Sequence, residues 1–167
     1  MSAENTTLVS PPQELLSPTA FCLPASGGGG RDSYDMVTSP DARISALTVV
    51  THDFWESLTF DEYNPVTKAT TPHPRHGGDG GDHVFPLTLG TDEYIYGLEG
   101  RYGTYVDYVK FYIRDRKSGA FRMFEAGNPH GGTHTFTYVP GIEYELYGFT
   151  LREGTYIDAI GPCFRTS

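Results

Sequence analysis

Residues 103–107 have the sequence Gly-Thr-Tyr-Val-Asp, and 51 residues later residues 154–158 have the sequence Gly-Thr-Tyr-Ile-Asp. The same offset relates three glycine pairs, Gly29-Gly30, Gly80-Gly81 and Gly131-Gly132. A constant offset without gaps indicates an internal repeat of one supersecondary unit. Three such repeats account for most of the 167 residues.

Other residue types recur in the same register. The apolar columns are Ile44, Ile95 and Leu146; Leu47, Leu98 and Phe149; Trp55, Val106 and Ile157; and Leu58, Val109 and Ile160. Aromatic columns are Tyr34, Phe85 and Phe136, and Phe54, Tyr105 and Tyr156, and an acidic column is Glu56, Asp107 and Asp158. Side-chain character alternates along residues 104–113 and 142–151, as it does in half-buried strands. We therefore predict that the apolar columns form the core and that each repeat supplies about four strands.

Three repeats of this kind predict an all-β fold. A propeller needs about four blades or more, so three repeats are too few for one. Three four-stranded antiparallel sheets can instead form the faces of a prism around one shared core. Residues 1–20 lie outside the repeat register and are rich in Pro, Ser and Thr, so we predict a flexible tail there and one domain over residues 21–167.

Composition excludes several classes of function. Asp and Glu number 21 against 12 Lys and Arg, giving a formal net charge of -9, so nucleic acid and anionic membrane surfaces are poor partners. No apolar run approaches the roughly 18 residues that a spanning helix needs, so we expect no membrane insertion. Residues 1–5 have neither a basic start nor an apolar stretch, so we expect no secretory signal and a cytoplasmic location, with non-classical export as the alternative.

The loop at residues 103–107 and its copy at 154–158 have a chemistry suited to a sugar. An ionised carboxylate only accepts hydrogen bonds, and adjacent backbone N–H groups only donate them. Sugar hydroxyls do both, so the combination fits a vicinal diol or a ring oxygen with its hydroxymethyl group. The first repeat departs from this pattern, because His52 replaces the glycine and Glu56 replaces the aspartate.

Over residues 21–167 these features resemble the jacalin-related lectins. The resemblance rests on the Gly-rich loop before Tyr34-Asp35-Met36, the Gly-Gly-Asp-Gly-Gly run at 77–81, the two Gly-x-x-x-Asp loops, and the segments 98–103 and 157–161. It implies the β-prism I fold, with Greek-key sheets and pseudo-threefold symmetry. It also implies carbohydrate binding with no catalysis and no metal or other cofactor.

The resemblance further implies sugar sites that each combine an acid loop with the glycine loop of the next repeat. Site 1 would comprise Gly30, Thr155, Tyr156 and Asp158. Site 2 would comprise Gly132, Thr104, Tyr105 and Asp107. Site 3 would need Gly81, Asp53, Phe54 and Glu56, and we do not count it among the expected sites, because positions 52 and 56 depart from the pattern.

Mannose- or glucose-type glycans and glycoproteins are the expected partners. Galactose-preferring members of the family are cleaved at the Gly-rich loop, whereas here Gly27–Gly30 continue from an upstream segment. One shallow site binds weakly, so we expect affinity to come from two sites on one chain or from homo-oligomers. The resemblance places the first and last strands in one sheet, near Cys22 and Cys163, and we expect both cysteines to be reduced in the cytoplasm.

Three other functions remain as alternatives. A glycoside-processing enzyme could use His52, Asp53 and Glu56, but the repeat places their equivalents at different corners of the prism, and no nucleophile or nucleotide motif is present. A metal site could use the cluster His73, His76, Asp79, Asp82 and His83, or His130 with His134, but we expect solvated loop histidines there. The third alternative is a protein-interaction scaffold whose sugar loops are inert.

Overall fold

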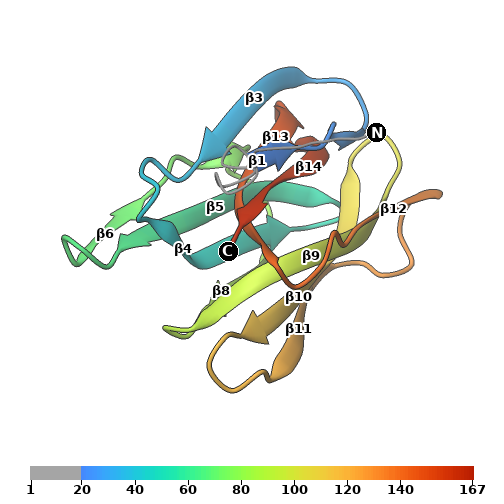
Figure 1. Cartoon of the computed structure of the whole chain (residues 1–167). Helices are drawn as coiled ribbons and strands as arrows, with labels where there is room; N and C mark the ends of the chain where they lie inside the picture. The colour runs from blue at the N-terminus through green and yellow to red at the C-terminus, as the bar shows by residue number, and fades with distance from the viewer. Residues whose placement is uncertain (1–19) are drawn as a thin grey trace, which may run out of the picture.

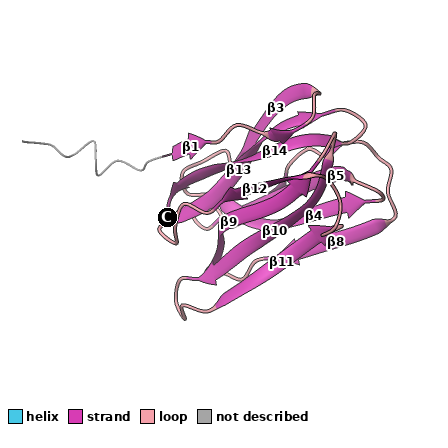
Figure 2. Ribbon diagram, turned by 90° about the vertical axis from the view of Figure 1, so that its right-hand side faces the viewer, coloured by secondary structure: helices cyan, strands magenta, loops and turns pink. Residues whose placement is uncertain are grey.

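Strands form the framework of the computed structural model, which describes residues 20–167 (Figure 2). These residues contain no helix, and therefore none that is long and apolar enough to cross a bilayer. All strand pairs are antiparallel. The all-β prediction is confirmed, whereas the predicted tail lies outside the described residues except for Ala20, which begins the first strand.

The strands form three sheets, which we call I, II and III (Figure 1). Sheet I comprises β1 (Ala20–Cys22), β2 (Ser26–Gly27), β3 (Arg31–Met36), β13 (Tyr144–Glu153) and β14 (Ile157–Thr166). Sheet II comprises β4 (Arg43–Thr51), β5 (Trp55–Asn64), β6 (Ala69–Pro72), β7 (His76–Gly77) and β8 (His83–Thr88). Sheet III comprises β9 (Glu93–Tyr102), β10 (Val106–Asp115), β11 (Phe121–Gly127) and β12 (His134–Tyr138).

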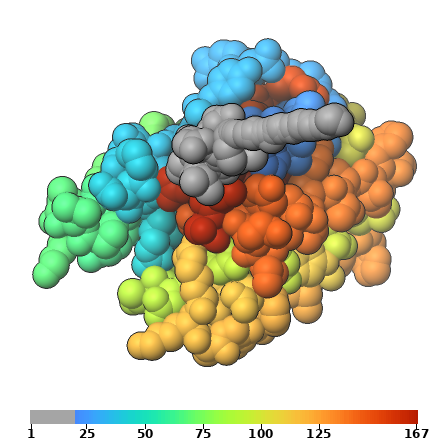
Figure 3. Space-filling model, viewed as in Figure 1, coloured from blue at the N-terminus to red at the C-terminus, as the bar shows by residue number. Residues whose placement is uncertain are grey.

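The strand order is that of a Greek key. In sheet III the order is β11-β10-β9-β12, so the fourth strand returns to lie beside the first. Sheet II has the same order, β6-β5-β4-β8. Sheet I repeats it with strands from both ends of the chain, β1-β14-β13-β3, which lie side by side in the upper part of the molecule (Figure 3).

Sheets I and II have five strands where we predicted four, because an outer strand is divided in each. In sheet I both β1 and β2 pair with β14, and in sheet II both β6 and β7 pair with β5. Pro24 lies in the first interruption and Pro74 in the second. Proline has no N–H to donate to a ladder, so it interrupts pairing at an edge. The corresponding strand of sheet III, β11, contains no proline and is continuous.

The predicted apolar columns form the shared core. Their members are nearly all inaccessible, and Trp55, Leu98, Val109, Phe149 and Ile160 are fully buried in one cluster. Burying a large apolar side chain contributes roughly 1.5–3 kcal/mol relative to exposure, so these columns hold the sheets together. The column of Tyr34, Phe85 and Phe136 is different, because Tyr34 is 68% exposed while Phe136 is buried.

Cys22 and Cys163 form a disulfide, contrary to the expectation of reduced thiols. The two residues face each other directly in the pairing of β1 with β14. The sequence places them 141 residues apart, so only the closure of sheet I by the two ends of the chain brings them together. The implied proximity of the first and last strands is therefore confirmed.

Candidate functional site

Three acid loops have the same backbone form. Each connects two paired strands by three residues, and the first loop residue donates a hydrogen bond to the carbonyl of the third. The pairs are Gly154 to Tyr156 at 3.0 Å, Gly103 to Tyr105 at 3.0 Å and His52 to Phe54 at 3.1 Å. Neither Gly103 nor Gly154 has a left-handed φ, so His52 closes the same hairpin without strain.

The three acid loops meet at one end of the prism instead of occupying remote corners. The rings of Phe54, Tyr105 and Tyr156 contact one another, with centroid separations of 4.7 Å, 5.8 Å and 4.5 Å. These are the equivalent residues of the three repeats, so the aromatic column lies on the pseudo-threefold axis. Part of each ring stays accessible, which leaves an apolar surface between the sites.

Site 1 combines residues from the two ends of the chain. A Cβ atom placed on Gly30 would lie 2.1 Å from Asp158 Oδ2, so the glycine backbone touches the carboxylate directly. Any side chain at this position would displace Asp158, which explains the requirement for glycine. Thr155 is exposed, and Tyr156 follows it in the same loop.

Sites 2 and 3 have the corresponding arrangement. A Cβ atom on Gly132 would lie 2.7 Å from Asp107 Oδ2, and one on Gly81 would lie 3.0 Å from Glu56 Cγ. Gly132 and Gly81 also have φ values of 71° and 99°, which favour glycine. Thr104 and Asp53 are exposed in their acid loops. The structure thus brings the glycine and the acid of all three sites into contact, including those of the third.

Glycine loops also contact the neighbouring acid loop. A Cβ atom on Gly28 would lie 2.1 Å from Thr104 O, and one on Gly78 would lie 2.3 Å from Thr155 O. Each of these two glycine loops therefore packs between the acid loop of its own site and the acid loop of a neighbouring site. This close approach links the geometry of adjacent sites.

The site carboxylates are held in a largely dehydrated setting. Asp158, Asp107 and Glu56 are only 7%, 5% and 8% exposed. Burial raises the pKa of Asp158. The charge of Arg152 opposes this rise, and the charge of Glu153 adds to it. Burial also raises the pKa of Asp107, and Arg101 opposes it. A hydrogen bond that needs these ionised carboxylates is therefore lost at a higher pH than for an exposed aspartate.

Site 3 differs in its electrostatics. Burial raises the pKa of Glu56, with His52 opposing the shift and Asp53, Asp79 and Asp82 among the groups that raise it further. His52 itself is exposed and hydrogen-bonds Asp82 at 3.0 Å. An arginine lowers the pKa of the carboxylate at each of the other two sites, whereas at Glu56 the opposing charge is that of His52.

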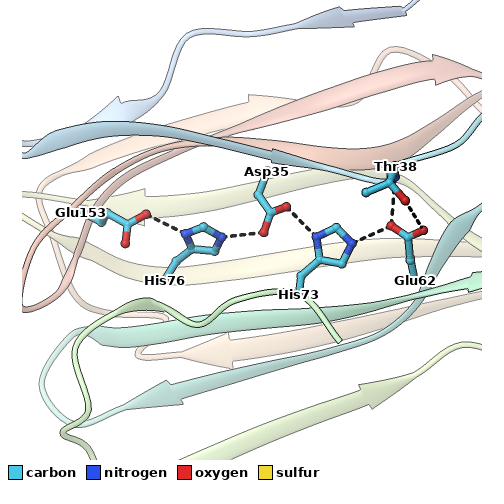
Figure 4. A network of polar contacts seen from close by, with 6 residues as sticks. All are labelled: Asp35, Thr38, Glu62, His73, His76 and Glu153. Carbon is cyan, nitrogen blue, oxygen red and sulfur yellow. Dashed lines mark hydrogen bonds and ion pairs between the residues drawn. The ribbon is translucent and has the colours of Figure 1, made fainter. Parts of the chain in front are cut away.

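His73 and His76 are buried in a polar network, contrary to the expectation of solvated loop histidines (Figure 4). His76 bridges Glu153 Oε2 at 2.7 Å and Asp35 Oδ2 at 2.6 Å. His73 bridges Asp35 Oδ1 and Glu62 Oε1, each at 2.6 Å. The network joins β3 and β13 of sheet I to β5 of sheet II, a structural role that the sequence analysis missed.

Both ring nitrogens of each histidine face a carboxylate oxygen. A neutral imidazole would direct a lone pair at one of these oxygens, whereas an imidazolium donates at both nitrogens. Accordingly, the hydrogen bond to Asp35 raises the pKa of His76 against the effect of burial. Burial lowers the pKa of His73, but its bonds to Glu62 and Asp35 outweigh that and raise it. The acceptor carboxylates show the reverse, because hydrogen bonds outweigh burial and lower their pKa values. The donors are His76 and His73 for Asp35, Thr38 and His73 for Glu62, and Ser33, Gly77 and His76 for Glu153.

The network predicts a stability that peaks in mildly acidic solution. The raised pKa of His76 gives a contribution that is complete below about pH 6.5 and lost as the pH rises through the folded-state pKa. The lowered carboxylate pKa values give a contribution that is lost in stronger acid. We expect His76→Gln to reduce the unfolding free energy by about 2 kcal/mol at mildly acidic pH, and by less in alkali. Urea unfolding at both pH values measures this difference.

His130→Gln is the matched control, because this histidine is exposed. Its unfolding free energy should follow the wild type at every pH. If the loss of unfolding free energy caused by His76→Gln grew toward alkaline pH, this result would contradict the charged form of the network.

Among residues 20–167, no three His, Cys, Asp or Glu side chains converge as a group able to hold a metal ion. His73 and His76 direct their nitrogens at different carboxylates along a row, and His52 and His83 share Asp82 at the surface. A chain of paired donors and acceptors explains these histidines without a metal.

Comparisons with known proteins agree on one family. The sequence model of the Jacalin-like lectin domain matches residues 23–163. An agglutinin of Castanea crenata is 31% identical over 147 residues, covering 81% of this chain and 43% of that protein. The jacalin-related lectin Calsepa of Calystegia sepium is 30% identical over 93 residues, covering 51% of this chain and 56% of that protein. The chain thus matches about half the length of these curated relatives.

Solved structures share the fold at lower identity. The Calystegia sepium agglutinin superposes with a TM-score of 0.71 at 22% identity, covering 89% of this chain and 98% of that one. A Malaysian banana lectin gives 0.70 at 22% identity, with 89% and 100% coverage. Artocarpin, solved as a complex with mannotriose, gives 0.69 at 19% identity, with 87% and 97% coverage. These likenesses confirm the predicted β-prism fold.

Proposed function

Because the chain belongs to the family of the Jacalin-like lectin domain, we propose that it is a lectin that binds mannose- or glucose-type glycans and leaves them chemically unchanged. The observation that carries this proposal is the contact between the Gly30 backbone and the Asp158 carboxylate at site 1. The Asp158 carboxylate as acceptor and the Gly30 backbone as donor lie side by side at the end of the prism where the acid loops meet, as recognition of a sugar hydroxyl pair requires.

The hydrogen-bond inventory of site 1 supports this role. Asp158 accepts from sugar hydroxyls, while the N–H groups of Gly30, Thr155 and Tyr156 donate to sugar oxygens. In the described residues none of these three N–H groups donates to another backbone carbonyl outside the strand ladders. Site 2 offers Asp107 with Gly132, Thr104 and Tyr105 in the same way.

Affinity for one monosaccharide should be low. A hydrogen bond to a charged group contributes about 1.5–3 kcal/mol, and loss of the sugar's own hydration offsets part of this. A shallow site then binds near the millimolar scale, or about -4 kcal/mol. Two sites at the same end of one chain raise the effective affinity for branched glycans.

The mannose preference rests on the continuity of the chain into the glycine loop. Residues Ser26–Gly27 form β2 and pair with β14, and Gly28 N–H donates to Asp158 O at 2.9 Å. The segment upstream of the glycine loop is therefore part of sheet I and lies directly beside Asp158. The matched Ananas comosus lectin is described as mannose-binding, and Calsepa was solved with a biantennary N-glycan.

The absence of catalysis is part of the proposal. A glycosidase needs two carboxyl groups on either side of one scissile bond. Here each carboxylate of the acidic column faces the glycine loop of its own site. This arrangement suits three separate binding sites at one end of the prism better than one reactive centre.

Retention on immobilised mannose tests the proposal. We expect the protein to be retained at neutral pH, to elute with methyl α-mannoside and to resist elution by methyl galactosides. A chelator should leave retention unchanged. Elution by galactose in preference to mannose, or failure to bind either sugar, would contradict the proposed function.

A further inference from the structure

Two arginines occupy the same place in successive repeats, 51 residues apart, and each reaches the glycine loop of its own site. Arg101 is the next-to-last residue of β9. It donates from Nε to Gly131 O at 2.7 Å and from Nη2 to Gly132 O at 3.0 Å. Arg152 holds the same position in β13 and donates from Nε to Gly28 O at 2.6 Å and from Nη2 to Gly27 O at 3.2 Å.

These bonds determine where the loop amides point. In a trans peptide the C=O and the following N–H point in opposite directions. When Arg101 binds the Gly131 carbonyl, the Gly132 N–H is directed away from the guanidinium, and both glycines lie against the Asp107 carboxylate. Arg152 binds two carbonyls slightly upstream in its loop, so it fixes the peptide planes that lead into Gly28 and Gly29, directly before Gly30.

Glycine loops benefit most from such a restraint. Ordering a residue costs about 1–2 kcal/mol in backbone entropy, and glycine has the most freedom to lose. A guanidinium with a rigid fork of donors holds two carbonyls at once. The arginine therefore orders the loop before a sugar arrives, which reduces the cost of binding.

The first repeat lacks this restraint. Its equivalent residue is Val50, whose Cγ1 would lie 2.7 Å from a Cβ atom on Gly81. All three loops share one backbone anchor, from Gly28 to Asp158 O, from Asn128 to Asp107 O and from Gly78 to Glu56 O. Only sites 1 and 2 add a guanidinium.

We propose that Arg101 and Arg152 are positioning residues that clamp the glycine loops of the two sugar sites by their carbonyl oxygens, and that Val50 leaves site 3 unclamped. The inference rests on the proposed function and adds a reason why two of the three sites bind. The same arginines oppose the burial-driven rise in the pKa of Asp107 and Asp158, while Glu153 is the other charged group that acts on Asp158.

The test isolates one site at a time. In an Asp107→Asn chain only site 1 binds, and Arg152→Gln is added to it. Methyl α-mannoside is titrated across a pH series. We expect affinity at neutral pH to fall about tenfold and the acidic limb of binding to move to higher pH. Arg152→Lys should keep the position of the acidic limb but lose affinity, because lysine retains the charge without the fork.

Arg122→Gln is the control, because this arginine pairs with Glu93 and contacts no glycine loop. It should change neither affinity nor the pH limb. Arg101→Gln in an Asp158→Asn chain should reproduce the result at site 2. The inference would be overturned if the Asp107→Asn chain binds and adding Arg152→Gln changes neither its affinity nor the position of the acidic limb. A wild-type chain that binds no mannoside would overturn the proposed function and the inference together.

Discussion

Replacing both Asp158 and Asp107 by asparagine is expected to abolish glycan binding, and either single replacement is expected to halve the number of sugars bound per chain. Each carboxylate accepts from sugar hydroxyls, and each such bond contributes about 1.5–3 kcal/mol. Asparagine presents an N–H₂ group in place of one acceptor oxygen, and its remaining oxygen carries no charge. The hydrogen bonds to both oxygens are therefore weakened. A site near the millimolar scale then falls below detection.

Calorimetric titration with methyl α-mannoside gives both affinity and stoichiometry. Asp41→Asn is the matched control, because this aspartate is exposed in the loop between β3 and β4. It should bind as the wild type does. Gly30→Ala supplies an independent check, since its Cβ would lie 2.1 Å from Asp158 Oδ2 and would displace that carboxylate. Undiminished binding by the doubly substituted, folded chain would favour a scaffold whose sugar loops are inert.

Removal of the disulfide is expected to produce the largest change in stability. Serine at Cys22 and Cys163 opens a loop with a sequence separation of 141 residues. By the chain-entropy relation, the unfolding free energy falls by about 4–5 kcal/mol. The native fold should persist, because the apolar core is formed by other residues of all three sheets.

Urea unfolding of the serine variant against the wild type measures this loss. Thiol titration of the native protein supplies the complementary check and should find no free cysteine. A disulfide persists where thiols stay oxidised, so free thiols in freshly isolated protein would support the predicted cytoplasmic location instead. A change below about 1 kcal/mol would contradict the role given to the bond.

The repeat predicts most of the fold, because residues that recur at one offset occupy equivalent places. The pairing of Gly30 with Asp158 follows instead from the resemblance to the jacalin-related lectins. The same register aligns Arg101 and Arg152 with Val50. This difference between the repeats is visible in the sequence and indicates that the first repeat lacks the arginine. The hairpin at position 52 does not need glycine, so His52 leaves the backbone of the third acid loop unchanged.

Contacts between unlike positions were beyond such reasoning. The network of His73 and His76 takes its carboxylates from β3, β5 and β13, and nothing in the sequence indicates that Asp35 lies between the two imidazoles. The spacing of two histidines around Pro74 was the available hint, and it suggested a loop. The Cys22–Cys163 bond likewise depends on strand register, which only the closed sheet defines.

The central claim is that a glycine loop and the acid loop of a neighbouring repeat bind a sugar between them. Amide-resolved NMR during titration with methyl α-mannoside tests it most directly. We expect the resonances of Gly30, Thr155 and Tyr156, and of their counterparts in site 2, to shift saturably, while those of Gly81 and Asp53 stay in place. Saturable shifts confined to another face of the prism, or none at high sugar concentration, would contradict the account.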